Sequence, residues 1–175
     1  MSILGKVKVS VLNIKRKIIR NYYTKRIKRH SRMCGDGLKV NAKSEVNGKT
    51  YLGNNVNFNG MSIRGYGVVK IGDNFHSGTD CIMITDVHNY DNGRAIPYDD
   101  TYIVKDINIK DNVWLGTRVT VLGGVTIGEG AIIQAGSTVV SDIPDGAIAG
   151  GHPAKVFKYR DMEHYYKLKN EGKFH

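Results

Sequence analysis

The stretch VWLGTRVTVLGGVTIGEGAIIQAGSTVV, residues 113–140, is regular without being helical or showing the alternation of an ordinary strand. Around it an aliphatic residue recurs at every sixth position, and a second small or apolar residue generally follows each of these by four. The first set is Ile109, Leu115, Val121, Ile127, Ile133 and Val139, and the second is Val113, Val119, Val125, Ala131, Ser137 and Ile143. The repeating unit is therefore six residues long.

A short strand with a tight corner every six residues satisfies this period, because aliphatic side chains then point inward. Gly53, Gly72, Gly116 and Gly128 directly follow an aliphatic position, with other glycines and asparagines nearby, and we interpret them as residues that tolerate unusual φ. Coils stacked about 4.8 Å apart share one core and one backbone ladder. The pattern predicts an all-β solenoid. An earlier segment repeats it less cleanly, with the pairs Leu52/Val56, Phe58/Ser62, Ile71/Phe75, Ser77/Cys81 and Met83/Val87.

Length and cysteine content restrict the class of protein. A chain of 175 residues suits one domain with appendages. Cys34 and Cys81 lie far apart without a C-x-x-C motif, so neither a disulfide framework nor a structural zinc is expected, and a reducing cytoplasm is the natural compartment. With neither an apolar run of about 18 residues nor a signal peptide, we expect a protein that is not exported that way and not integral to a membrane.

The positive charge is concentrated at the front of the chain. Residues 1–32 hold 11 of the 26 Lys and Arg residues and no acid, so the rest is close to neutral. We expect a basic amphipathic helix in residues 1–35, because Leu4, Val7, Val11, Ile14, Ile18 and Tyr22 recur at steps of three and four. The helix either caps the open end of the solenoid or lies on an anionic membrane through residues 1–32. Nucleic acid is not expected, because the body lacks a basic groove and a known motif.

Two further segments flank or interrupt the period. The sequence ITDVHNYDNGRAIPYDDTYIVKDI breaks it after Met83, which places an inserted loop at 86–106 within a solenoid domain of residues 36–157. The tail, 158–175, is expected to form a short helix against the last coil. In the loop, His88 has a side chain that can accept a proton near neutral pH, although a single histidine can equally be a solvated loop residue. Asp86 either orients the imidazole or caps its own backbone.

Residues 50–160 resemble the left-handed β-helix acyltransferases built from hexapeptide repeats. In that family three hexads form one coil, so residues 18 apart stack, as Leu115 would on Ile133 and Thr120 on Thr138. The ending GAIAGGHPAKVFKYR, residues 146–160, resembles the G-x-P-A-[KR]-V motif of the family. Together with VWLGTRVTVLGGVTIG, it is typical of the branch that uses coenzyme A to acetylate sugars.

The resemblance implies acetyl-CoA as cosubstrate and assigns residues to it. Thr117 and Ala135 would offer backbone groups to the pantetheine arm, Val140 and Ser141 would lie along it, and Lys155 and Lys158 would meet the phosphates. Ser141 is uncharged where relatives often carry a base. Trp114 would form a wall of the acetyl channel, or else be an exposed aromatic at an outward position, and Cys81 is expected in the core.

The same resemblance places a catalytic base where His88 lies, at the exit of the repeat. A metal site shared with His76, as in β-helical carbonic anhydrases, is not expected, because the two histidines are 12 residues apart, two thirds of a coil, with no third histidine nearby. We predict an acetyl-CoA-dependent O-acetyltransferase that modifies a sugar hydroxyl in surface polysaccharide biosynthesis. The resemblance implies a homotrimer. From the cysteine content and the basic helix we expect a cytoplasmic protein, with peripheral contact at the inner face of the membrane as an alternative. The alternatives are an amino-sugar N-acetyltransferase and a non-catalytic trimeric scaffold.

Overall fold

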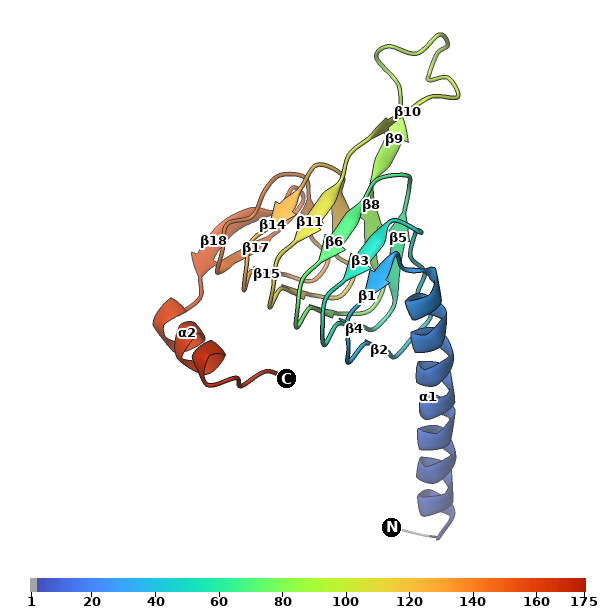
Figure 1. Ribbon diagram of the computed structural model, residues 1–175, viewed down its shortest axis with the longest axis vertical. Helices are drawn as coiled ribbons and strands as arrows, with labels where there is room; N and C mark the ends of the chain where they lie inside the picture. Colours follow the sequence, from blue (N-terminus) through green and yellow to red (C-terminus); the bar gives the residue numbers. More distant parts are fainter. Residues whose placement is uncertain (1–2) are drawn as a thin grey trace.

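The computed structural model describes the backbone of residues 3–175 and the side chains from residue 12 onward. Short strands stack into three parallel sheets around one core (Figure 1). The first sheet contains β1 (Met33–Cys34), β3 (Thr50–Leu52), β6 (Val69–Ile71), β11 (Ile107–Ile109) and β14 (Thr126–Ile127). The second contains β2 (Lys39–Val40), β4 (Asn57–Phe58), β7 (His76–Ser77), β12 (Trp114–Leu115), β15 (Ile132–Ile133) and β17 (Ala147–Gly150), with β18 (Lys155–Tyr159) added antiparallel. The third contains β5 (Met61–Arg64), β8 (Cys81–Ile84), β13 (Thr120–Leu122) and β16 (Thr138–Val139).

The core is built from the two sets of the six-residue period. Every residue of both sets is at most 3% exposed, including Ser137, whose hydroxyl accepts a hydrogen bond from the Gly151 amide. Leu115 stacks on Ile133 and Thr120 on Thr138, as the resemblance to the hexapeptide-repeat family implies. The all-β solenoid of six-residue repeats that the sequence predicts is thereby confirmed as the fold class, and it is consistent with the left-handed β-helix that the resemblance implies.

The less regular early segment departs from the prediction at two positions. Met61 and Ile63 fill the core where Ser62 was expected, and Ser62 is only half-buried. The reason is a longer coil: Ile63 pairs with Met83, 20 residues later, so the alternation of inward side chains changes phase. Val87 is 47% exposed rather than inward, because the chain has already left the coil at that point.

The corner glycines serve a different purpose from the one predicted. Positive φ occurs two residues later, at Asn55, Asn74, Arg118 and Gly130, not at Gly53, Gly72, Gly116 and Gly128. These glycines instead allow successive coils to approach: a Cβ on Gly116 would lie 2.5 Å from the Ala135 amide nitrogen. The prediction of permissive backbones was therefore right for the nearby asparagines and wrong for these glycines, which are required by space.

A basic helix, α1 (Ile3–His30), closes the N-terminal end of the solenoid. Its last turns carry the contacts: Ile27 is buried, Tyr23 packs beside it, and Thr24 Oγ1 accepts from the Val40 amide at 3.0 Å. The predicted stripe does not form this cap, because Ile14, Ile18 and Tyr22 are each about three-fifths exposed. The exposed fractions are 58%, 63% and 58%. The side chains of Leu4, Val7 and Val11 lie outside the described residues.

The chain ends in α2 (Met162–Asn170), where Asp161 caps the first turn by accepting from the His164 amide at 3.0 Å. Tyr165 is the buried residue of this helix. Figure 1 shows the C-terminal segment turning back below the solenoid toward β4. In the part of the chain that the structure describes, no helix combines the length and the apolarity needed to cross a bilayer.

Candidate functional site

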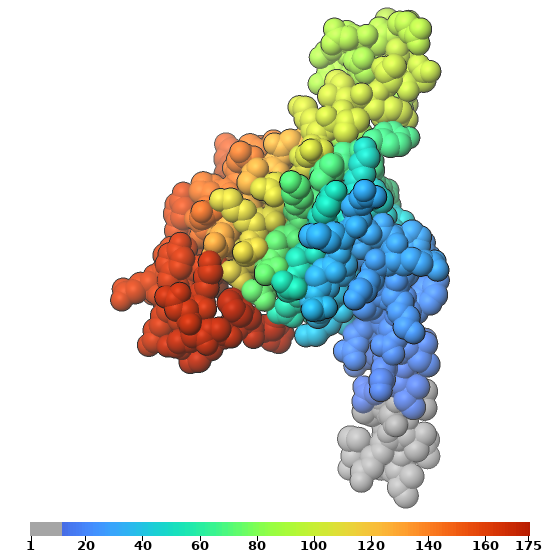
Figure 2. Space-filling view, viewed as in Figure 1, coloured from blue at the N-terminus to red at the C-terminus, as the bar shows by residue number. Residues whose placement is uncertain are grey.

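The insertion predicted at 86–106 forms a two-stranded arm. Strands β9 (Asp86–His88) and β10 (Tyr102–Val104) pair antiparallel, with His88 opposite Tyr102 and Asp86 opposite Val104. The arm projects from the edge of the solenoid between β8 and β11 (Figures 1 and 2). The coil closes beneath it, since Trp114 still pairs with His76 although 38 residues separate them. The arm is thus carried on a rigid base and leaves the repeat intact.

His88 is held between two tyrosines of the arm. Its ring stacks on Tyr98 with centroids 3.8 Å apart and planes 15° apart, and the Tyr102 ring lies 4.6 Å away on a tilt. Nδ1 is buried and has no hydrogen-bond partner among the described residues. The aromatic contacts fix the imidazole plane, and Nε2 is left as the ring nitrogen that can reach another molecule.

Asp86 binds the corner of the preceding coil. Its Oδ2 accepts from the Tyr66 amide at 3.1 Å, and the Tyr66 ring packs edge-on against Tyr102 at 5.4 Å. Gly65 permits this approach, because a Cβ there would lie 2.6 Å from the Asp86 carboxylate. In the described structure, Asp86 therefore anchors the base of the arm, and its carboxylate is not hydrogen-bonded to His88.

The tip of the arm is organised by Asp99. Its carboxylate accepts from the Thr101 hydroxyl at 2.6 Å, the Thr101 amide at 2.9 Å and the Arg94 amide at 2.8 Å. These hydrogen bonds, with that from Thr101 Oγ1 foremost, lower the pKa of Asp99 to about 2. Asp99 thus has a structural role in the loop. Tyr90 and Asp91 remain exposed, as does Asp100, whose carboxylate pairs with Arg94 at 3.5 Å.

The residues assigned to the cofactor lie on successive coils at the corner between the second and third sheets and along β16. Thr117 and Ala135 occupy stacked corners, and the Gly136 amide donates to Thr117 O at 2.7 Å. The Ala154 amide donates to Thr138 O at 2.8 Å, which brings the segment before Lys155 to β16, while Val140 and Ser141 follow that strand. These residues lie on the outer surface of the repeat, where most of them are exposed to solvent. Those exposed are Thr117, Ala135, Val140, Ser141, Lys155 and Lys158.

Both lysines of this group are exposed on β18, and neither forms an ion pair with a described carboxylate. Trp114 lies on the outer face of the second sheet between His76 and Ile132 and is 52% exposed. Cys81 is buried, as expected, and its thiol donates to Gly116 O at 3.1 Å. The two exposed lysines, which have no ion-pair partner among the described residues, can attract a phosphorylated ligand as compact cations.

No described contact joins His88 to Trp114 or Thr117, so the arm and the cofactor surface of one chain remain separate. Sequence reasoning also missed two features: the tyrosines that enclose His88, and a groove of about 610 Å³ between the second sheet and the C-terminal segment. The tyrosines of the loop could have suggested the stacking on His88, but no local sequence pattern predicts the groove. Among the described residues, no group of three or more His, Cys, Asp or Glu side chains could hold a metal ion.

Comparison with known proteins shows which proteins this architecture resembles. Residues 106–141 match the family described as bacterial transferase hexapeptide (six repeats). A galactoside acetyltransferase solved in complex with coenzyme A superposes with a TM-score of 0.68 and 28% identity over 78% of this chain and 70% of that one. A hexapeptide-repeat acetyltransferase of Vibrio cholerae, solved with acetyl coenzyme A, gives 0.57 and 25% over 75% and 73%.

Two curated protein sequences are also similar to this chain. A protein of Schizosaccharomyces pombe, named provisionally as an acetyltransferase, is 39% identical over 99 residues, which cover 55% of this chain and 45% of that protein. A Staphylococcus aureus protein with the same kind of name is 54% identical over 57 residues, 33% of this chain and 29% of its own length. The chain thus spans less than half of the curated relatives it matches. Over residues 106–141 it is similar to the hexapeptide-repeat transferases, and most of its fold is similar to that of acetyltransferases solved with coenzyme A or acetyl coenzyme A.

Proposed function

We propose that the protein is an acetyl-CoA-dependent O-acetyltransferase that acts on a sugar hydroxyl, in surface polysaccharide biosynthesis. The observation that carries this proposal is the placement of His88, an imidazole clamped between Tyr98 and Tyr102 on an arm at the exit of the repeat. The galactoside acetyltransferase bound to coenzyme A supports the reaction class. A purely structural solenoid would require neither the clamped imidazole nor the exposed lysines of β18.

In the proposed mechanism, Nε2 of His88 acts as general base. With the proton on the buried Nδ1, Nε2 presents its lone pair and removes the proton of the acceptor hydroxyl. The hydroxyl oxygen attacks the thioester carbonyl, backbone N–H groups stabilise the oxyanion, and the C–S bond breaks. The proton on His88 then passes to the departing thiolate, so that no acyl-enzyme is formed. Asp86 acts indirectly, by anchoring β9 to Tyr66.

The proposed binding mode places the pantetheine arm over Thr117 and Ala135 and along Val140 and Ser141. Lys155 and Lys158 meet the phosphates as point charges, and Trp114 forms a wall of the acetyl channel. Within one chain the arm and this surface are separate, which favours a homotrimer in which His88 of one copy faces the cofactor surface of the next. Each active site would then draw on two chains.

Release of free thiol from acetyl-CoA in the presence of a pool of sugars tests the proposal. His88→Ala should reduce acceptor-dependent release by at least about a hundredfold, the contribution of a general base. His30→Ala, which removes an exposed histidine on α1, should leave the rate unchanged. Equal rates for wild type and His88→Ala would remove His88 as base, and failure to bind coenzyme A would favour the scaffold.

Transfer to an amino sugar is the alternative within the same reaction class. The two products differ in chemistry, since an acetyl ester is cleaved by mild alkali and an amide is not. If the labelled acetyl groups stay on the product after mild alkali, the reaction is N-acetylation and the proposed O-acetylation is wrong.

We also propose that the projecting part of α1 lies on an anionic membrane surface. Ile14, Ile18 and Tyr22 are exposed on a helix that carries many cations and no acid, the composition that binds anionic lipid. Because Ile27 is part of the core, the test keeps the full chain. The double variant Ile14→Asp/Ile18→Asp should lose co-sedimentation with anionic vesicles. The control variant Asn13→Asp/Asn21→Asp, with the same added charge outside the stripe, should retain most of the co-sedimentation. Equal loss in both variants would show that charge alone, and not the apolar stripe, determines binding to the vesicles.

A further inference from the structure

The C-terminal segment and the outer face of the second sheet enclose a groove of about 610 Å³, a size typical of small-molecule sites. Residues of four strands, β4, β7, β12 and β15, form its floor, and α2 with the tail forms its wall. The groove lies where Figure 1 shows the red segment turning back below the solenoid. The lining residues on which the argument depends are Asn57, His76, Trp114, His164, Leu168 and Phe174.

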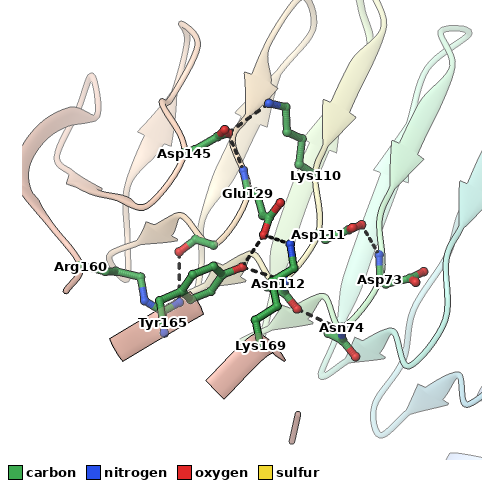
Figure 3. A network of polar contacts seen from close by, with 11 residues as sticks. Asp73, Asn74, Lys110, Asp111, Asn112, Glu129, Asp145, Arg160, Tyr165 and Lys169 are labelled. Atoms are coloured by element: carbon green, nitrogen blue, oxygen red, sulfur yellow. Dashed lines mark hydrogen bonds and ion pairs between the residues drawn. The ribbon is translucent and has the colours of Figure 1, made fainter. Parts of the chain in front are cut away.

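The wall is fixed in place by a polar network (Figure 3). The Tyr165 hydroxyl donates to Glu129 Oε1 at 2.8 Å and accepts from Asn112 Nδ2 at 2.8 Å. Asn112 ends a ladder of amides, since Asn55 donates to Asn74 at 3.0 Å and Asn74 donates to Asn112 at 2.9 Å. The groove is thus preformed on the rigid repeat, which reduces the entropy cost of binding a ligand.

The cations near the groove are engaged by the protein itself. Lys169 pairs with Glu129, and Lys173 pairs with Glu171 at 2.7 Å. Arg160 donates to Gly130 O at 3.1 Å and lies 4.9 Å from the centroid of the Tyr165 ring. Little positive charge is left for a phosphate or another anion.

Neutral hydrogen-bonding groups dominate the floor. The Asn57 amide nitrogen donates to no described group, while its oxygen accepts from Asn41 at 3.0 Å. The His76 Nε2 lies 3.2 Å from the amide nitrogen of Asn59, and burial together with the nearby His175 imidazole lowers the pKa of His76. His76 is therefore neutral at pH 7, and together these groups offer both donors and acceptors. Trp114 and Phe174 add apolar surface, each about half exposed.

We propose that this groove binds a neutral oligosaccharide, with a sugar ring against Trp114 and hydroxyl groups on Asn57 and His164. Amides and imidazoles match hydroxyls as partners, and an indole face matches the apolar face of a sugar ring. The identification of the bound saccharide with the acceptor rests on the proposed function, because it depends on Trp114 also forming a wall of the acetyl channel. Binding itself does not depend on it.

Trp114 is the only tryptophan of the chain, so its emission reports on the groove directly. The full-length protein carrying His88→Ala is titrated, without acetyl-CoA, with neutral tri- and tetrasaccharides of glucose, galactose, mannose and N-acetylglucosamine. We expect a saturable change in emission for at least one of them. Asn57→Ala and His164→Ala should each weaken binding about fivefold, the effect of one hydrogen bond. Lys167→Ala, on the side of α2 away from the groove, should not change it.

Three results would overturn the proposal: no response to any saccharide, an undiminished response in both groove variants, or a response to nucleoside diphosphates but not to neutral saccharides. A second readout separates this inference from the proposed function. If saccharides bind but wild type releases no thiol, the groove stands and the acetyl transfer fails. If thiol release proceeds and neither groove variant changes the KM for a saccharide acceptor, the acetyl transfer stands and the groove is not its acceptor site.

Discussion

Replacing Gly116 by alanine should destabilise the solenoid, because the added Cβ has no room. It would lie 2.5 Å from the Ala135 amide nitrogen and 2.8 Å from the Ala135 Cα. Both are backbone atoms of the next coil, and the Gly116 amide donates to Ile133 O at 2.8 Å, which holds the two coils together. No side chain can rotate to relieve the contact, so the coils must separate locally.

The expected cost is that of overpacking, about 1–3 kcal/mol. In a chain of this size, 1 kcal/mol shifts the unfolding midpoint by about 2–4 °C, so the midpoint should fall by roughly 2–12 °C. Backbone strain does not contribute, because Gly116 is not among the described residues with positive φ. The loss should therefore come from space alone.

Thermal unfolding followed by circular dichroism measures the effect against two controls. Gly48→Ala places a Cβ where nothing lies within 4 Å and should change stability by at most about 0.5 kcal/mol. Gly136→Ala also has free space but a φ of +74°, so it isolates the backbone strain of about 1–2 kcal/mol. If Gly116→Ala and Gly48→Ala have the same unfolding midpoint, close approach of the corners is not the reason for glycine at position 116.

Three further outcomes are expected. Tyr165→Phe removes the hydroxyl between Asn112 and Glu129, which should destabilise the docking of α2 by about 1 kcal/mol. The backbone amides of α2 should then exchange with solvent faster. Unchanged exchange would show that the network does not hold the wall of the groove. Because the folded-state pKa of Asp99 is depressed, its stabilisation of the arm is complete above its unfolded pKa of about 4 and is lost as pH falls to about 2. NMR signals of the Thr101 and Arg94 amides should shift in that window, and Asp99→Asn should abolish the shift. Lys155→Ala should raise the KM for acetyl-CoA several-fold with kcat unchanged, and the difference should shrink as salt is added; a salt-independent effect would exclude a phosphate contact.

The sequence predicted the repeat well because the fold depends on local spacing. The six-residue period identified inward residues such as Leu115 and Ile133, and the resemblance to the hexapeptide-repeat family supplied their register, three hexads to one coil. It failed at Ser62, where a coil of 20 residues breaks the spacing. It misjudged the corner glycines because the distance between coils is a property of the stack and leaves no trace in a single hexad.

Less of the candidate site could be predicted. The resemblance singled out His88 at the exit of the repeat before the inserted loop, but its stacking on Tyr98 depends on the path of the ten residues between them. Which face of α1 caps the solenoid was left open, since periodicity finds an apolar stripe without showing which part of it meets another element. The groove depends on pairing Tyr165 with Asn112, 53 residues earlier, a distance at which sequence patterns give no guidance.

The placement of these features follows from the repeat itself. A solenoid fixes every inward residue through its core and ladder, so chemistry can vary only on outward positions and where the chain leaves the stack. The arm that carries His88 and the tail that forms the groove are both such departures, one between β8 and β11 and the other after β18. Each is fastened to the repeat by contacts that the period does not require, Asp86 with Tyr66 and Tyr165 with Asn112. Loosening either contact should therefore impair function before it affects global stability, because the ladder beneath remains intact.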